Sequence, residues 1–133
     1  PQAIWLVVDM AYPATNIPAM AGADCLNTTQ TYPQKTRWEM LDPEGEYEDI
    51  YNRYCHIRAS FGSKTMLELV STDYVEVTLS PEDLKKLNIR YIVSTNDFDE
   101  KIAAGTTNIF TDSGIEFQKY YEGAQLSIYG CVY

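Results

Sequence analysis

The stretch SPEDLKKLNIRYIVS, residues 80–94, carries the clearest structural signal in the sequence. Ser80 is a favourable helix N-cap, Pro81 suits the first helical position, and the carboxylates that follow suit the positive end of the helix dipole. Asp83 follows the cap by three positions, which is the spacing of a capping box. After the helix, RYIVS (90–94) is a buried apolar run. We therefore expect a short helix that leads directly into a strand.

Segments on both sides of this unit alternate between apolar and polar residues, as half-buried strands do. TMLELVS (65–71) and YVEVTLS (74–80) are separated by two residues, which predicts a hairpin or one long bent strand. The second of these segments, the helix and 90–94 together predict a compact right-handed crossover. At the end of the chain, IEFQKYY (115–121) and QLSIYGCVY (125–133) predict another hairpin.

The N-terminal half adds two strands and two helices. AIWLVVD (3–9) is a continuous apolar run ending at a carboxylate, and a proline-containing loop with at most a helical turn follows it. A short strand is expected near Cys25 and Leu26, and helices are expected over 34–41 and 46–55, with a DPEG turn between them. The mixed order of elements predicts an α/β (or α+β) fold, with a mixed sheet of about five to six strands and two to three short helices packed on it.

Length and charge limit the classes of protein that the chain can belong to. Its 133 residues suit one soluble domain, and it contains no apolar run long enough to cross a bilayer. Because the chain starts directly before a strand and stops within another, we expect a domain, 1–133, excised from a longer membrane protein. A net charge of −9 argues against nucleic acid as a partner and against docking on an anionic membrane surface.

Three cysteines and one glycosylation pattern bear on the cellular compartment. Cys25, Cys55 and Cys131 lack metal-ligand spacing and cannot all pair with one another. A disulfide between Cys25 and Cys55 can form if the protein lies outside the cytoplasm. Cys131 is expected to be a buried free thiol. The segment NTT (27–29) matches the acceptor pattern for N-glycosylation, which matters only in a eukaryotic secretory protein.

YNRYCHIR, residues 51–58, is the richest candidate site and contains the only histidine of the chain. A functional interpretation makes His56 a general base or ligand, with Arg53 and Arg58 binding an anionic group. A single histidine without a second nitrogen or sulfur ligand at metal spacing gives no metal site. We therefore predict no metal and no cofactor.

A structural interpretation of the same residues is favoured. It places Tyr51 and Tyr54 on the core side of the helix 46–55 and Arg53 in an ion pair with Asp49. His56 then caps the carbonyl end of that helix. Even so, we expect any binding surface to include this stretch.

Three further features bear on the prediction of a site. DFDE (97–100) follows a strand and has carboxylates spaced to chelate Mg²⁺, but no glycine-rich phosphate loop accompanies it, so an acidic loop is favoured. No serine occurs in a nucleophile elbow, so we predict no catalytic residue in this domain. Aromatic rings bind sugars by stacking, and of the eleven tyrosines and two tryptophans we single out Tyr12, Tyr32 and Trp38, which lie near predicted loops.

Three segments resemble the C-terminal soluble domain of a group of bacterial multi-pass membrane proteins. They are YPQKTRWEMLDPEGEYEDIYNRYCHI (32–57), SPEDLKKLNIRYIVS (80–94) and GIEFQKYYEGAQLSIYGCVY (114–133). Those proteins are similar to GT-C-type glycosyltransferases, which use lipid-linked sugars at the outer face of the cytoplasmic membrane. Their catalytic carboxylate lies in an early extracytoplasmic loop that has no counterpart here, so no catalytic residue carries over. The resemblance implies a location on the extracytoplasmic face of a bacterial cell membrane.

We therefore expect a non-catalytic accessory domain of a polytopic membrane protein of glycosyltransferase-like type. It would pack against the membrane-embedded part of its own polypeptide, or help to hold a glycan or lipid-linked sugar acceptor. The expected binding residues are Tyr51, Arg53, Tyr54, His56, Arg58, Trp38 and Tyr32. Two alternatives stay open: a small stand-alone enzyme or binding protein that acts on an anionic ligand through His56, Arg53 and Arg58, and an interaction module without a small ligand.

Overall fold

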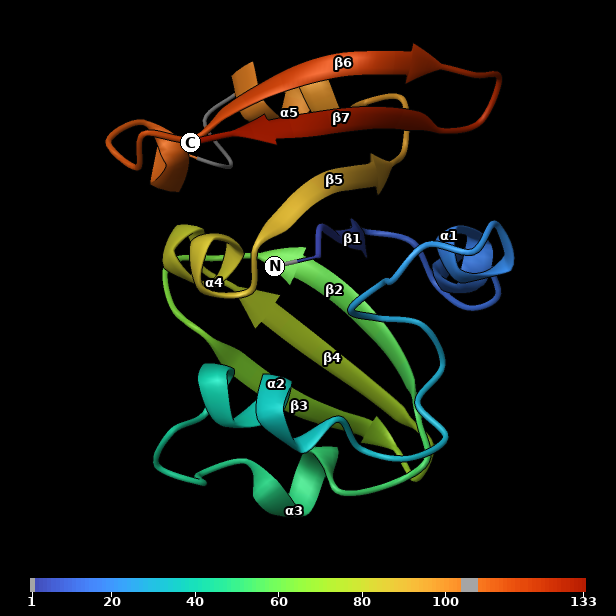
Figure 1. Cartoon of the computed structure of the whole chain (residues 1–133), viewed down its shortest axis with the longest axis vertical. Helices are drawn as coiled ribbons and strands as arrows, with labels where there is room; N and C mark the ends of the chain where they lie inside the picture. Colours follow the sequence, from blue (N-terminus) through green and yellow to red (C-terminus); the bar gives the residue numbers. More distant parts are fainter. Residues whose placement is uncertain (1, 104–107) are drawn as a thin grey trace.

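The computed structural model describes residues 2–103 and 108–133, which form two mixed sheets with short helices packed against them (Figure 1). One sheet has the strand order β1-β5-β7-β6 and the other the order β2-β4-β3. The predicted α/β class is confirmed. The described residues contain seven strands in two sheets, in place of the expected single sheet of five to six strands.

In the four-stranded sheet, β1 and β5 are parallel and the remaining neighbours are antiparallel. Its strands are β1 (Ile4–Val7), β5 (Ile89–Ser94), β6 (Glu116–Glu122) and β7 (Ser127–Val132). The predicted strand at 3–9 and the predicted C-terminal hairpin are thus confirmed. Near Cys25 the structure contains a single bridge to Trp5, and not the short strand that we expected there.

In the three-stranded sheet, β4 lies in the middle, parallel to β2 and antiparallel to β3. Its strands are β2 (His56–Phe61), β3 (Met66–Ser71) and β4 (Tyr74–Leu79). The predicted hairpin of β3 and β4 is confirmed.

All the helices of the described residues are short. They are α1 (Ile17–Met20), α2 (Lys35–Leu41), α3 (Glu48–Tyr51), α4 (Pro81–Lys86) and α5 (Phe98–Ala103), with 3-10 turns at Ala14–Asn16 and Asn108–Phe110. The helix predicted over 34–41 is confirmed. The helix predicted over 46–55 is wrong beyond Tyr51, because the chain enters β2 there: the His56 amide donates to the Asp73 carbonyl at 2.8 Å.

The capping box of α4 is confirmed. The Asp83 carboxylate accepts from the Ser80 amide at 2.8 Å and from the Thr65 hydroxyl at 2.6 Å, and the Asp83 amide donates to the Ser80 hydroxyl. The predicted crossover is wrong, however, because β4 and β5 belong to different sheets. α4 therefore carries the chain from one sheet to the other.

The two sheets are joined at the end of β1. Val8 and Ala59 form a parallel bridge there. Val7, one residue before Val8, bonds to the fully buried side chain of Asn27. This side chain accepts from the Val7 amide at 3.0 Å and donates to the Val7 carbonyl at 2.7 Å and the Ile57 carbonyl at 3.3 Å. Asn27 therefore takes the place of a strand residue between β1 and β2. Its complete burial also excludes the glycosylation that the NTT pattern allowed.

α2 and α3 cover one face of the three-stranded sheet (Figure 1). Trp38 of α2 and Tyr51 of α3 are both buried, and their rings stack with centroids 5.0 Å apart. Next to the four-stranded sheet, a second aromatic group fills the core with rings that meet mostly edge to face: Phe61, Phe98, Phe110 and Phe117. The other face of the three-stranded sheet, which carries His56 and Arg58, is only partly buried.

Substitution Asn27→Ala tests the joint between the sheets. We expect the free energy of unfolding to fall by about 3 kcal/mol, because the Val7 amide and carbonyl would stay buried without partners. Urea denaturation measures the change, and Asn52→Ala, at an exposed asparagine, should change it by less than about 0.5 kcal/mol. Equal effects of the two substitutions would contradict the role assigned to Asn27.

Candidate functional site: aromatic side chains around His56

The stretch YNRYCHIR is divided between the end of α3 and the start of β2. Ile57 and Ala59 point into the core, so His56 and Arg58 lie on the opposite face of the strand. His56 is therefore a strand residue and not the helix cap that we expected. Tyr54, expected on the core side, is 51% exposed.

Three tyrosines surround His56. The ring centroid of Tyr12 lies 4.0 Å from that of His56, and Tyr54 meets it edge to face at 5.6 Å. Tyr74, the register partner of His56 on β4, lies 6.3 Å away. Tyr12 is 49% exposed, so two of the three rings offer much of their surface to solvent. We call these four residues the His56 cluster.

A short chain of hydrogen bonds orients the imidazole of His56. Its Nδ1 lies 3.0 Å from the Thr29 hydroxyl, which accepts from the Asn16 amide side chain at 3.0 Å. The Thr29 amide in turn donates to the Asn16 side-chain oxygen at 2.7 Å. When the Thr29 hydroxyl donates to Nδ1, the proton of the neutral ring resides on Nε2. Nε2 has no hydrogen-bond partner within residues 2–103 and 108–133, so it is available to a ligand.

Arg58 lies two residues further along β2 on the same face. Its guanidinium is 3.8 Å from the Asp9 carboxylate and 4.0 Å from the Glu76 carboxylate. Asp9 also pairs with Lys101 at 3.1 Å. The two flanking carboxylates compensate the charge of Arg58. This surface therefore offers both hydrogen-bond donors and acceptors, and it lacks the excess positive charge that would bind an anion.

Arg53 contributes to the fold and not to this surface. Its guanidinium donates to the backbone carbonyls of Ile50 and Asp49, each at 2.8 Å, and of Thr72 at 3.1 Å. The expected ion pair with Asp49 is thus replaced by a bond to the carbonyl of that residue. Arg53 ties the end of α3 to the turn between β3 and β4.

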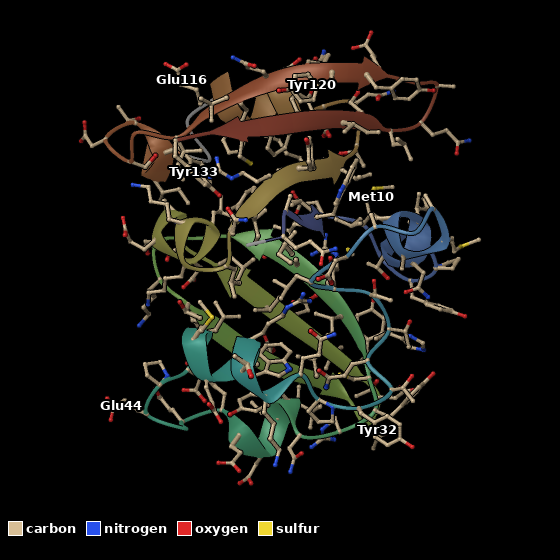
Figure 2. All side chains as sticks on the ribbon, viewed as in Figure 1. Met10, Tyr32, Glu44, Glu116, Tyr120 and Tyr133 are labelled. Atoms are coloured by element: carbon tan, nitrogen blue, oxygen red, sulfur yellow. The ribbon has the colours of Figure 1, made fainter. Side chains whose placement is uncertain are left out.

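The remaining predicted residues are divided between core and surface. Trp38 and Tyr51 are only 3% and 5% exposed, and burial raises the pKa of the Tyr51 hydroxyl. Tyr32 is 83% exposed on the loop before α2, and it lies at the opposite end of the molecule from Tyr120 (Figure 2). The structure thus brings Tyr54, His56 and Arg58 together on one face.

Tyr74 and Thr29 belong to the same surface but escaped the sequence analysis. Tyr74 comes beside His56 only through the parallel register of β2 and β4. Thr29 reaches His56 across 27 residues of sequence. No local pattern signals either contact. Tyr12, in contrast, was singled out from its place near a predicted loop.

DFDE is the start of a helix and not the acidic loop that we expected, since α5 begins at Phe98. Asp97 accepts from the Thr95 hydroxyl, and Asp99 pairs with Lys119 at 2.6 Å. The two carboxylates therefore bond within the protein. In the part of the chain that the structure describes, no group of three His, Cys, Asp or Glu side chains could hold a metal ion.

All three cysteines are buried free thiols. The Cys25–Cys55 disulfide that we left open is absent from the structure, and the expectation for Cys131 is confirmed. Burial raises the pKa of Cys25, that of Cys55 to about 11 and that of Cys131 to about 12. These thiols therefore stay protonated and unreactive near neutral pH.

Comparison with known proteins adds one match. A family model described as Domain of unknown function (DUF7654) matches residues 1–133. No curated protein and no solved structure matches the chain.

Thiol labelling tests the assigned burial. At pH 8 a maleimide should modify Cys55 and Cys131 about a hundredfold more slowly than an exposed cysteine introduced as Gln125→Cys, because their raised pKa values leave little thiolate at this pH. Mass spectrometry over time gives the rates. Denaturation should make all of the thiols react, whereas rapid labelling of the native wild-type protein would contradict the buried positions.

Proposed function

The chain belongs to the DUF7654 family along its whole length, and we propose from its surface that it is a non-catalytic, glycan-binding accessory domain of a bacterial membrane protein of glycosyltransferase-like type. The His56 cluster is the observation that carries this proposal. It exposes the rings of Tyr12 and Tyr54 beside polar groups on an uncovered face of a sheet.

Sugars present two kinds of surface to a protein. Their C–H faces stack on aromatic rings, and their hydroxyls both donate and accept hydrogen bonds. Here the half-exposed tyrosines supply the rings. The free Nε2 of His56 and the pair of Arg58 and Glu76 supply donors and acceptors along the same strands. Both requirements for a glycan are therefore met within one surface.

The contacts of His56 support a binding role over catalysis. The hydroxyl of Thr29 beside an imidazole is the first half of a nucleophilic site, but a working site also needs a third group that orients the base. Within the described residues nothing bonds to Nε2, and Asn16 engages the Thr29 hydroxyl. The alternative of an enzyme for anionic ligands loses support from Arg53 and Arg58, because backbone carbonyls bind the first and two carboxylates flank the second.

The resemblance stated above supplies the membrane context of the proposal. The domain would lie on the extracytoplasmic face of the cell membrane, with the membrane-embedded part of its own polypeptide as its partner and a glycan or lipid-linked sugar as its ligand. Among the described residues, no helix is long and apolar enough to span a bilayer. Because the net charge of −9 is repelled by anionic lipid headgroups, we expect the domain to lie away from the membrane surface.

Saturation-transfer NMR with oligosaccharides of glucose, galactose, mannose, arabinose and N-acetylglucosamine tests glycan binding. At least one should bind, and Tyr54→Ala should weaken it about tenfold through loss of a stacking ring while the melting temperature stays unchanged. The matched control is Tyr121→Ala, which removes a similarly exposed tyrosine from β6. Absence of binding by every sugar, or equal losses in both variants, would contradict the proposal.

Labelling of intact cells tests the proposed location. In the full-length protein in its bacterial host, Gln125→Cys should react with a membrane-impermeant maleimide, because Gln125 lies exposed between β6 and β7. The wild-type domain serves as the control, since its three thiols are buried. Reaction only after lysis would place the domain on the cytoplasmic side and overturn the proposal.

A further inference from the structure

A pocket of about 280 Å³ is lined in part by Thr29, the hydrogen-bond partner of His56, and we propose that it binds one neutral sugar unit of the glycan. This inference rests on the proposed function and adds a second contact region to it. Polar side chains from one short segment line the pocket, among them Thr28, Thr31, Tyr32 and Gln34. Its volume lies just below the range of about 300–1,000 Å³ for drug-sized ligands, which suits a single sugar ring.

Gln30 gives the pocket a rigid floor. Its backbone exchanges two hydrogen bonds with Cys55, at 2.8 and 3.1 Å. Its side-chain nitrogen donates to the carbonyls of Tyr51 and Arg53 at 2.7 and 2.8 Å, and its side-chain oxygen accepts from the Trp38 indole at 2.7 Å. A floor fixed in this way loses little entropy when a ligand binds.

The lip of the pocket, in contrast, carries polar groups that the fold does not use. The side chains of Thr31, Tyr32 and Gln34 make no hydrogen bond within the described residues. They offer two hydroxyls and one carboxamide, all of which can donate and accept. Sugar hydroxyls need partners of this double character, and the exposed ring of Tyr32 adds a stacking surface.

The charge of the pocket selects among sugars. Its one cationic side chain, Arg37, pairs with Asp24 at 2.5 Å and is thereby compensated. An anionic sugar would lack a free cation to replace its hydration. We therefore assign the pocket to neutral hexoses and N-acetylhexosamines, and not to uronic acids.

Thr29 connects the pocket to the His56 cluster. It lines the pocket, and its hydroxyl contacts His56 Nδ1. Thr29 is thus the residue that the pocket and the His56 cluster share.

Titration of ¹⁵N-labelled protein with glucose, galactose, mannose, N-acetylglucosamine and glucuronic acid tests the inference. A neutral sugar should shift the amide signals of residues 28–34, and glucuronic acid should bind at least about fivefold more weakly. Gln34→Ala and the shape-conserving Thr31→Val should each weaken the best neutral sugar by about fivefold, through loss of a hydrogen bond. Gln125→Ala, at an exposed glutamine outside the pocket, is the matched control and should leave binding unchanged.

The outcomes separate this inference from the proposed function. Shifts confined to Tyr12, Tyr54 and His56 would overturn the pocket and leave the glycan-binding function in place. Shifts at 28–34 that neither substitution weakens would also overturn the pocket as the contact. No shift with any monosaccharide would overturn the pocket, and if every oligosaccharide also failed to bind, the proposed function would fall with it.

Discussion

The side-chain amide of Asn27 makes the contact on which the arrangement of the two sheets depends. It bonds to the Val7 amide and carbonyl at the end of β1. Before this point β1 bonds to the backbone of Asp24 and Leu26, and after it the chain approaches β2. Without the Asn27 side chain, two backbone groups would be buried with no partner next to the Val8–Ala59 bridge, which connects the sheets. β1 and β2 can approach each other at this joint because the Asn27 carboxamide replaces a missing residue of the ladder.

The candidate site is a direct consequence of that joint. Once Asn27 is anchored, Thr29 contacts His56 and Gln30 pairs with Cys55, so three nearby positions of one segment are fixed against the start of β2. The side chains that follow Gln30 then remain free at the rim of the pocket. A rigid segment with unused polar groups beyond it is the arrangement expected of a preorganised binding surface.

Local sequence patterns predicted the elements that are stabilised by contacts between residues close together in the sequence. The capping box at Ser80 and Asp83 and the two hairpins are of this kind. The helix expected over 46–55 failed because Tyr47, Tyr51 and Tyr54 have helical spacing while Cys55, Ile57 and Ala59 have the alternation of a strand. Pairing of β2 with β4 decided between the two patterns, and such pairing is set by tertiary contacts.

The sequence predicted some residues of the candidate site but not the partners that tertiary contacts bring to them. Tyr54, His56 and Arg58 were named because reactive residue types gather there, but the role expected for His56 changed when the helix became a strand. Tyr74 and Thr29 required knowledge of the strand register. Asn27 matches only a glycosylation pattern in the sequence, since nothing local distinguishes a buried asparagine that bonds to backbone from an exposed one.

A crystal structure of the domain with a bound neutral oligosaccharide would test the central claim most directly. The account predicts one sugar ring stacked on Tyr54 and another sugar unit in the pocket, hydrogen-bonded to Gln34. The four-stranded sheet carries another row of rings, with Trp5 and Tyr91 4.6 Å apart and Tyr91 and Tyr120 6.2 Å apart. A glycan bound over that row, with the His56 cluster and the pocket empty, would contradict the account.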